Sequence, residues 1–456
     1  MRKRIVLALV LVLALLATTS CSLIVKDEEV DKQTPIIEID GQDPITKETV
    51  NAQVAQIQAY MESYYSYYGM TYDATDVTAL SQARQEAVDG LVQNAVIQQK
   101  IREMGLEQLT DEEEAQAKAD ADSTWQTAVD SVKTYYFADT ELTGDELDKA
   151  VADKMTELGY PTYDEVLAST ENSVAQEKLR AEVVKDVTVS DEELQQSYSV
   201  KMEEAKARYE ANPSYYGTDV SNGTTIYYVP AGYRYVKNIL IKLTDEDSAK
   251  ISDLNSQISS ANSELTTAQT SLNDLGDDAS ADDENTAKNR QDLTDTVEKL
   301  TAQISDLQAQ LDAATEAAYA AIQPTVDEVL AKLAEGEDFD TLMEQYGQDT
   351  GMQQSPAKEN GYPVSADSTN WVSEFTEAAM ALAKVGDTSS QGVRTSYGIH
   401  ILKYVSDAVE GEVGLDAVRD VLEAEVLADK QDTLYNSTLE AWVQEANAKI
   451  YLDRLN

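Results

Sequence analysis

The sequence is almost free of two residue types that enzyme sites often use, since it contains one histidine, His400, and one cysteine, Cys21, in 456 residues. Hydrolases and metalloenzymes usually draw on several histidines as proton carriers or metal ligands. Any reaction that this chain catalyses must therefore need very little general acid or base. The chain is nevertheless long enough to bury a sizeable core and to form two or three domains.

Basic residues are also scarce, because 35 Lys and Arg stand against 84 Asp and Glu and give a formal net charge of −49 at pH 7. A field of this sign repels phosphate backbones and anionic lipid headgroups. We therefore expect no nucleic-acid partner, and any membrane attachment must come from something other than electrostatics. The charge suits a soluble surface that handles unfolded chains, and it equally suits an acidic surface with no specific role.

The first twenty residues have the form of an export signal. Residues 2–4 are basic, residues 5–17 form an apolar run too short to span a bilayer comfortably, and residues 18–20 form a small-residue cleavage site. Cys21 follows directly, and the segment resembles a bacterial lipoprotein lipobox. The resemblance implies a lipid anchor on Cys21 and a location at the extracytoplasmic face of the cell membrane. An ordinary secretory signal with a chance cysteine is the alternative. Residues 21–44 lack periodicity and are expected to be a tether.

From about residue 45 the hydrophobic pattern becomes helical. Apolar residues between 88 and 96 recur at helical spacing, Gly105 marks a helix end, and capping boxes open helices at Thr110 and Ser190. Residues 45–229 are therefore predicted to form a mostly helical N-terminal domain.

Tyrosine is unevenly distributed, and residues 60–72 contain six tyrosines and two methionines. Tyrosine combines apolar contact area with a polar tip, which suits a surface that binds varied extended peptides. A helix that packs these rings into its own domain explains the same residues. The sequence alone leaves both interpretations open.

Residues 251–322 contain two heptad seams, in which apolar residues at 251–275 and again at 293–318 step alternately by three and four. The acidic segment between them, opened by Gly276, predicts a turn that folds the two helices back on each other. Such an antiparallel coiled-coil hairpin returns the chain to where it left and can be inserted into a domain. A dimer formed through one long helix is the competing interpretation. A last helical pattern, from about residue 415 to 452, is too apolar to be a free tail.

Four segments around the hairpin resemble a parvulin-type peptidyl-prolyl isomerase domain. They are "ILIK" (239–242), "LAEGEDFDTLMEQYGQD" (333–349), "EFTEAAMALAKVGD" (374–387) and "VRTSYGIHILKYV" (393–405). The resemblance implies an α+β domain at residues 230–407, with the hairpin at 251–322 inserted after its first strand. The helical flanks resemble those of PrsA- and SurA-like foldases. That similarity implies a mostly helical chaperone domain built from residues 45–229 and a C-terminal helix within 408–456.

The parvulin resemblance also implies a set of site residues. In parvulins a histidine of the closing strand lies beside a histidine of the first strand and near an aspartate or cysteine. His400 matches the first and Asp349 the acidic position, while the first-strand position is Asn238, which can still donate and accept hydrogen bonds. Phe375 matches the aromatic residue of the proline pocket. Trp371 stands where a pliant apolar residue is usual, which implies a smaller or lidded pocket.

The implied reaction explains how one histidine could suffice. Rotation about an X-Pro amide breaks no bond and moves no proton, and its barrier of about 18–20 kcal/mol is the loss of C–N double-bond character. No cofactor, metal or nucleophile is implied. The expected function is a membrane-anchored foldase that isomerises X-Pro bonds in unfolded or newly secreted polypeptides. Because Asn238 breaks the histidine pair, a weak or inactive parvulin-like chaperone that binds such chains is the alternative.

Overall fold

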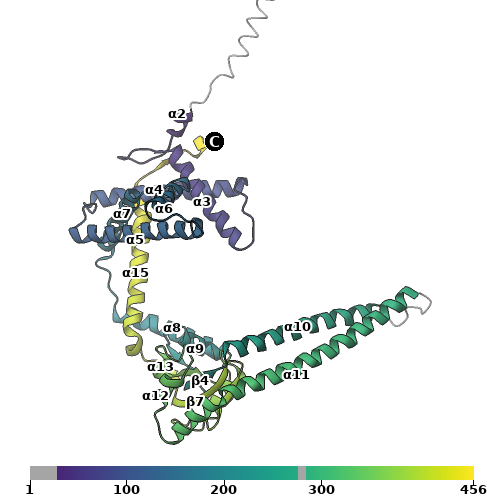
Figure 1. Ribbon diagram of the computed structural model, residues 1–456. Coiled ribbons are helices and arrows are strands. Elements are labelled where there is room, and N and C mark those ends of the chain that lie inside the picture. The colour runs from purple at the N-terminus through teal and green to yellow at the C-terminus, as the bar shows by residue number, and fades with distance from the viewer. Residues whose placement is uncertain (1–27, 276–283, 456) are drawn as a thin grey trace, which may run out of the picture. The chain divides into compact units, whose positions relative to one another are not determined.

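The computed structural model describes residues 28–275 and 284–455, and its contacts divide the chain into two compact units (Figure 1). The first unit comprises the described residues up to Thr188 together with those from Leu427 onward, and the second is Val189–Val426. Cys21, the predicted export signal and most of the predicted hairpin turn lie outside the described residues. Within 28–275 and 284–455, no helix is long and apolar enough to cross a membrane.

The first unit is mostly helical. Its elements are α2 (Glu28–Lys32), β1 (Pro35–Glu38), β2 (Ile45–Thr46), α3 (Lys47–Tyr67), α4 (Val77–Glu103), α5 (Asp111–Tyr136), α6 (Asp145–Glu157), α7 (Tyr163–Val184), the later part of α15 (Leu415–Glu445), β9 (Lys449–Ile450) and a 3₁₀ turn, η1 (Leu452–Leu455). Helix α5 begins at the predicted capping box, in which Thr110 accepts from the Glu113 N–H and the Glu113 carboxylate reaches back. The predicted apolar face of α4 packs Val88 and Val92 into the core of the unit.

Part of the predicted tether belongs to this folded unit. Strand β1 pairs antiparallel with β2 and β9, and the side chains of Ile36 and Ile37 are fully buried. The prediction of a tether through residue 44 is therefore wrong from Pro35 onward. The pattern was missed because a four-residue strand is too short to display alternation, and its partner β9 comes from the other end of the chain.

The C-terminal helix is present but shorter than predicted. Helix α15 ends at Glu445, and Asn447 then adopts a positive φ of 48°, which turns the chain into strand β9. The helix packs near both of its ends, since Val418 and Leu422 lie in a core of the second unit while Trp442 and Val443 pack against cores of the first.

The second unit contains the predicted α+β domain. Its elements are α8 (Asp191–Ala211), α9 (Ser214–Ser221), β3 (Tyr228–Val229), β4 (Arg234–Lys242), α10 (Asp245–Asp274), α11 (Glu284–Ala334), α12 (Phe339–Tyr346), α13 (Ala357–Asn360), β5 (Tyr362–Val364), α14 (Ser373–Ala381), β6 (Val393–Thr395), β7 (Gly398–Asp407), β8 (Gly411–Glu412) and the first part of α15. The boundary differs from the expected one at residue 230. Helix α8 packs Leu194 and Tyr198 against Val418 and Leu422 of α15, so it is part of this unit.

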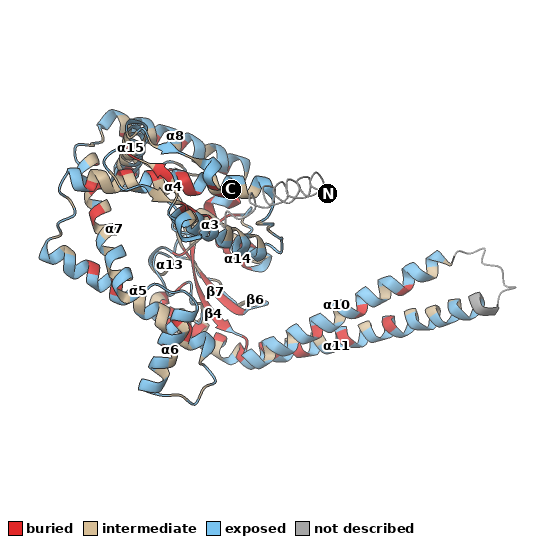
Figure 2. Cartoon of the chain, turned by 90° about the horizontal axis from the view of Figure 1, so that it is seen from above, coloured by how far each residue is buried: buried red, intermediate tan, exposed pale blue. Residues whose placement is uncertain are grey.

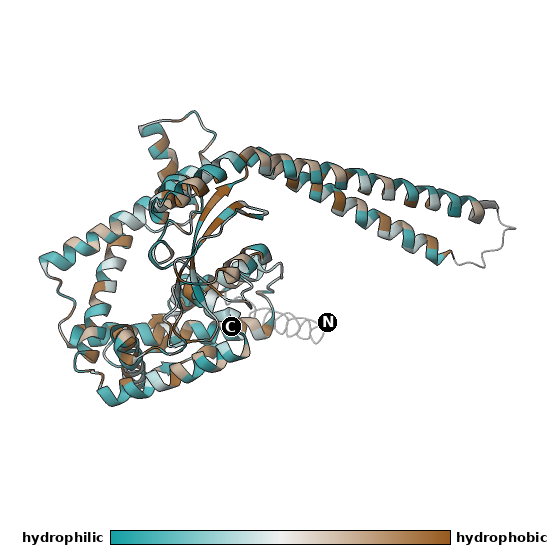
Figure 3. Ribbon diagram, turned by 90° about the horizontal axis from the view of Figure 1, so that it is seen from below, coloured by the Kyte–Doolittle hydropathy of each residue, from teal (hydrophilic) through white to brown (hydrophobic). Residues whose placement is uncertain are grey.

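A four-stranded antiparallel sheet in the order β5-β4-β7-β6 forms the centre of this unit, and its strands are largely buried (Figure 2). Side chains alternate between the two faces. Ile239, Ile241 and Ile401 face α11 and α12, whereas Val236 and Leu402 face α14. The long central strands read as nearly continuous apolar segments because both of their faces are covered (Figure 3).

The predicted hairpin is formed by α10 and α11, which run side by side away from the sheet (Figures 1 and 2). Its apolar seams meet, with Leu254 and Ile258 of α10 in one cluster with Leu307 and Leu311 of α11. The predicted end of the insertion at residue 322 is not a boundary. Helix α11 continues through Pro324 to Ala334, and its last four turns form the first helix of the α+β domain.

Candidate functional site

The central strands place Asn238 and His400 on the same face of the sheet. In the antiparallel register, Leu240 of β4 lies opposite His400 of β7, and Asn238 lies opposite Leu402. Asn238 and His400 are therefore diagonal neighbours, a separation that polar side chains can bridge. Both are buried, with 1% and 6% of their surfaces exposed. Buried polar groups require partners, and these two residues provide one for each other.

Asp349 is brought to this face by the loop that follows α12. The Gln348 N–H donates to the Leu240 carbonyl at 2.9 Å, which fixes the loop against β4. Asp349 Oδ1 accepts the Gly351 N–H at 3.0 Å and the Tyr362 hydroxyl at 3.0 Å. Gly351 is required for this approach, because a Cβ there would lie 2.4 Å from the Tyr362 hydroxyl oxygen.

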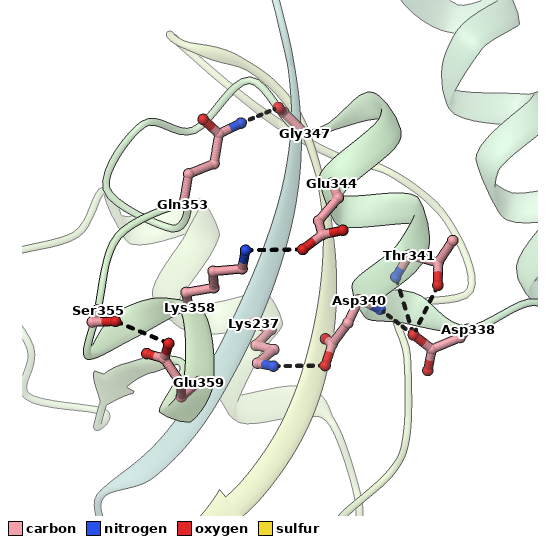
Figure 4. A network of polar contacts seen from close by, with 10 residues as sticks. All are labelled: Lys237, Asp338, Asp340, Thr341, Glu344, Gly347, Gln353, Ser355, Lys358 and Glu359. Atoms are coloured by element: carbon pink, nitrogen blue, oxygen red, sulfur yellow. Dashed lines mark hydrogen bonds and ion pairs between the residues drawn. The ribbon is translucent and has the colours of Figure 1, made fainter.

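The same loop is held from its other side by a set of polar contacts (Figure 4). Gln353 Nε2 donates to the Gly347 carbonyl at 2.8 Å, and Lys358 pairs with Glu344 of α12 at 2.9 Å. On the opposite face of β4 from Asn238, the buried Lys237 pairs with Asp340 at 2.8 Å. These contacts fix α12 and the loop relative to β4, and so they fix the position of Asp349.

Asp349, Asn238, His400 and Thr395 form one chain of hydrogen bonds. Asn238 Nδ2 donates to Asp349 Oδ2 at 2.9 Å, which turns Asn238 Oδ1 toward His400 Nδ1 at 3.1 Å. An ionised carboxylate can only accept, so this orientation of the amide follows from Asp349. Nδ1 of His400 then carries the proton, and Nε2 accepts from Thr395 Oγ1 at 2.8 Å. Thr395 Oγ1 in turn accepts the Tyr397 N–H at 3.2 Å.

His400 is neutral in this setting. Burial lowers the pKa of its imidazole from the usual 6.5 to about 4, and the negative charge of Asp349 opposes that effect only in part. Burial also raises the pKa of the Tyr362 hydroxyl, and the nearby Asp349 charge raises it further. Tyr362 therefore remains a hydrogen-bond donor to Asp349 at any physiological pH.

Three aromatic rings form a wall next to this chain of hydrogen bonds. Tyr362 and Trp371 have ring centroids 4.3 Å apart, and Trp371 and Phe375 are 5.5 Å apart. Phe375 meets the imidazole of His400 edge to face at 5.4 Å. Trp371 Nε1 donates to the Pro363 carbonyl at 3.2 Å, which fixes the orientation of the indole ring. The wall is therefore rigid and continuous with the polar chain.

The wall and the polar chain together enclose one cavity of about 310 Å³. Its lining residues are Asn238, Leu240, Lys242, Asp349, Thr350, Tyr362, Asn370, Trp371, Val372, Phe375, Tyr397 and His400. A cavity of this size, with one apolar side and one polar side, suits a small cyclic apolar group attached to a peptide. Among the described residues, no group of three His, Cys, Asp or Glu side chains could hold a metal ion.

All five predicted site residues within the described range line this cavity, and two further participants were not predicted. Tyr362 and Thr395 bond directly to Asp349 and His400. Thr395 could have been found from its place three residues before Gly398, because a tight turn returns it to the face of His400. Tyr362 gave no such signal, since its contact depends on how β5 pairs with β4.

Comparison with known proteins places the site in a recognised domain. Residues 306–406 match the family model of the PPIC-type PPIase domain, and residues 1–131 match that of the SurA-like N-terminal domain. The first match covers Asp349, Phe375 and His400 but begins inside the second arm of the hairpin. Strand β4, which carries Asn238, lies before the matched segment and joins it only in the fold.

Curated relatives include the foldase protein PrsA of Oceanobacillus iheyensis, 35% identical over 133 residues, which are 28% of this chain and 42% of that protein. The foldase protein PrsA of Geobacillus kaustophilus is 36% identical over 129 residues, 28% of this chain and 43% of that protein. The matches thus span less than half of each relative. A crystal structure of PrsA from Bacillus subtilis aligns with 72% of this chain and 82% of its own, at 17% identity and a TM-score of 0.21. The chain is therefore similar to PrsA- and SurA-like foldases, and its residues 306–406 match the PPIC-type PPIase domain.

Proposed function

We propose that this protein is a membrane-anchored extracytoplasmic foldase that catalyses cis–trans isomerisation of X-Pro bonds in newly exported polypeptides. The proposal is carried by one observation, the hydrogen-bonded chain of Asp349, Asn238 and His400 on the polar side of an aromatic-walled cavity. The match of the surrounding segment to the PPIC-type family supports it.

The cavity offers the two elements that the reaction needs. The wall of Trp371 and Phe375 would hold the prolyl ring in place. The carbonyl group of the preceding residue would then rotate about the C–N bond while the ring stays fixed. In the twisted state the amide nitrogen loses conjugation, and a low-dielectric site with fixed dipoles favours that state over the planar amide. The carboxylate of Asp349, oriented by Tyr362 and Asn238, would supply such a field in the cavity.

The role we assign to His400 is one of position and not of proton transfer. Its imidazole is neutral, and both ring nitrogens are already bonded to Asn238 and Thr395. No described donor or acceptor on the ring is left for a substrate. His400 would therefore hold Asn238, and Asn238 would hold Asp349, in the orientation that the substrate meets.

The anchoring and the substrates are further parts of the proposal. Cys21 lies outside the described residues, and a lipid there would keep the chain at the outer face of the membrane. Uncatalysed X-Pro isomerisation takes tens to hundreds of seconds, long enough to limit the folding of a newly exported chain. The two relatives named above are foldase proteins, which agrees with such substrates.

The test is acceleration of cis–trans isomerisation in a panel of X-Pro tetrapeptides by the chain starting at Ser22. We expect the His400→Ala, Asp349→Ala double variant to lose about 10- to 100-fold in kcat/KM, because removing one preorganised group commonly costs that much or more. Asp367→Ala, an exposed position in the neighbouring loop, serves as the control and should keep full activity.

One observation favours a second candidate function, a parvulin-like chaperone that binds unfolded chains without turnover. The first-strand position holds Asn238, where parvulins have a histidine. If the folded wild-type chain accelerates none of the peptides, the isomerase proposal fails and the chaperone remains. If the double variant is as active as the wild type, the chemistry lies elsewhere in the chain.

A further inference from the structure

The tyrosine-rich segment of α3 forms an exposed patch on the first unit. We define the tyrosine patch as Tyr60, Tyr64, Tyr67, Tyr68 and Met70, whose side chains are 67%, 48%, 85%, 58% and 52% exposed. The rings contact one another, with centroids 5.1 Å apart for Tyr64 and Tyr68 and 5.2 Å apart for Tyr67 and Tyr68. The interpretation that these rings pack into their own domain is therefore wrong for Tyr60, Tyr64, Tyr67 and Tyr68, which are exposed.

A different part of α3 packs into the core of the first unit. Val50 and Val54 of α3 are buried against α4, with Ile57 at the edge, and the patch begins one turn later. The patch is nevertheless built on fixed backbone. Gln58 Nε2 donates to the Ala74 carbonyl at 2.8 Å, and Tyr65 contacts Tyr72 at 5.5 Å, so the connection to α4 folds back on α3. A rigid array of exposed rings presents contact area at little entropic cost.

The stretch of sequence that carries the patch has charges of one sign. Residues 48–83 contain no Lys or Arg, whereas Glu62, Asp73 and Asp76 belong to that stretch. Elsewhere in the described chain, cations cover tyrosine rings. Lys154 lies 4.8 Å from the ring centre of Tyr136, Arg208 lies 4.7 Å from that of Tyr215, and Arg234 lies 4.3 Å from that of Tyr404. No Lys or Arg of the described residues lies over any ring of the patch.

We propose that the tyrosine patch binds unfolded polypeptide segments that carry Arg or Lys. The incoming cations take the places over the rings that the protein's own basic residues occupy elsewhere, and the neighbouring carboxylates add attraction. The inference rests on the proposed function, because it names the chemistry of the segments that the foldase holds. It assigns that binding to the first unit and keeps it separate from the X-Pro cavity of the second.

The chain offers a matched control for the experiment. Tyr67 and Tyr68 lie at the end of α3, and Tyr135 and Tyr136 lie at the end of α5 with 84% and 46% exposure and a similar ring separation of 5.0 Å. The variants Tyr67→Ser, Tyr68→Ser and Tyr135→Ser, Tyr136→Ser each remove two exposed rings and change no charge. The probe is an unstructured, proline-free peptide of Gly, Ser and Arg, compared with the same peptide containing neutral citrulline in place of Arg.

We expect the α3 variant to bind the Arg peptide about tenfold more weakly than the wild type, since two cation–π contacts are lost. The α5 variant should bind it as the wild type does, and the citrulline peptide should bind weakly to all three. Equal affinity of the α3 variant and wild type for the Arg peptide overturns the proposal, as does equal binding of the citrulline peptide. A change in sedimentation of the α3 variant without a change in peptide affinity would instead assign the patch to a second copy of the chain. Because the probe lacks proline, turnover of X-Pro tetrapeptides is measured separately and can fail or succeed independently.

Discussion

His400, the only histidine in the chain, has a pKa near 4 because it is buried. In the unfolded chain its pKa is about 6.5. As the pH falls from 6.5 toward 4, the unfolded state binds a proton that the folded state does not. Folding of the second unit therefore loses up to about 3 kcal/mol through this one group, a loss that is absent above pH 6.5.

Because there is no second histidine, the imidazole resonances of His400 can be read directly by NMR. We expect them to remain at the positions of the neutral, Nδ1-protonated form from pH 7 down to pH 5. Asp349→Asn should lower the pKa further, because the carboxylate charge is what opposes the effect of burial. A midpoint near 6.5 in the folded protein would contradict the buried, fully bonded imidazole.

We expect histidine at position 238 to preserve the isomerase activity and leucine at the same position to reduce it. A neutral histidine can donate one ring N–H to Asp349 and accept the Nδ1 proton of His400, as Asn238 does now. We therefore expect Asn238→His to have equal or higher kcat/KM. Asn238→Leu should lose at least about tenfold, because the buried His400 Nδ1 is left without a partner and Asp349 loses one of its donors. The assay is the same X-Pro panel, with thermal unfolding as the check on folding. A collapse of turnover in a folded Asn238→His variant would contradict the assigned role.

Much of the site could be predicted at the scale of single residues. The family resemblance of three segments can be recognised from the sequence alone, and these segments contain His400, Asp349 and Phe375. The position of the first strand then identifies Asn238. Tyr362 could not be predicted in the same way, because its contact with Asp349 depends on strand register and on a loop of "TGMQQSPAKENG" that departs from the family pattern. Thr395 lies in one of the quoted segments, but its bond to His400 follows only from the pairing of β6 with β7.

At the scale of elements, the hairpin shares a helix with the domain that carries it. Tyr319 and Ile322 of α11 lie in the core against the sheet, and the Tyr319 hydroxyl donates to the Thr395 carbonyl at 2.9 Å. Removal of residues 259–306 with a short linker should therefore leave the sheet and the cavity folded. Ile258 and Leu307, at the two ends of that cut, lie in the same apolar cluster.

Removal of residues 251–322 should behave differently. It deletes Ala318, Tyr319 and Ile322 from the core and should lower the free energy of unfolding by more than about 3 kcal/mol. Urea unfolding of both deletion variants and of the full chain measures the free energy of unfolding and so checks both predictions. Equal stability of both deletions would show that α11 does not contribute to the core as described.

Helix α11 also contains a boundary that the sequence pattern could not predict. The heptad seams correctly located both arms, and α11 ends at Ala334, just before Gly336 with a φ of 91°. The inner boundary was missed because one continuous helix can change its packing partner without any change in periodicity. Partner identity is a property of the fold and leaves no local signal.

At the scale of the whole molecule, the predicted lipid anchor has a direct test. Cys21→Ala should release the protein into the soluble fraction, because the negative net charge gives no electrostatic attraction to anionic lipids. Ser22→Ala, one residue further on, is the matched control and should remain with the membrane. Retention of Cys21→Ala in membranes after a wash that strips peripheral proteins would argue against the lipid.

The division into two units was only partly predictable. The sequence indicated a helical N-terminal region, a central α+β domain and a C-terminal helix, and all three are present. The assignment of α8 to the second unit depends on Val418 and Leu422, which lie more than 200 residues further along the chain. Such distant pairings cannot be read from helical periodicity, since many apolar faces could satisfy α8 equally well.

The long sequence separation of the site residues has a consequence for the order of folding. Asn238 and His400 are 162 residues apart, and β4 obtains its main partner only when β7 is available. During synthesis, which proceeds from the N-terminus, the two hairpin arms can pair locally and shorten the loop that remains to be closed. The cavity can then form only after β7 has been made. A chain interrupted before residue 393 would have most of its helices in place and no cavity, so unfinished copies of the protein would have nowhere to seat a prolyl ring.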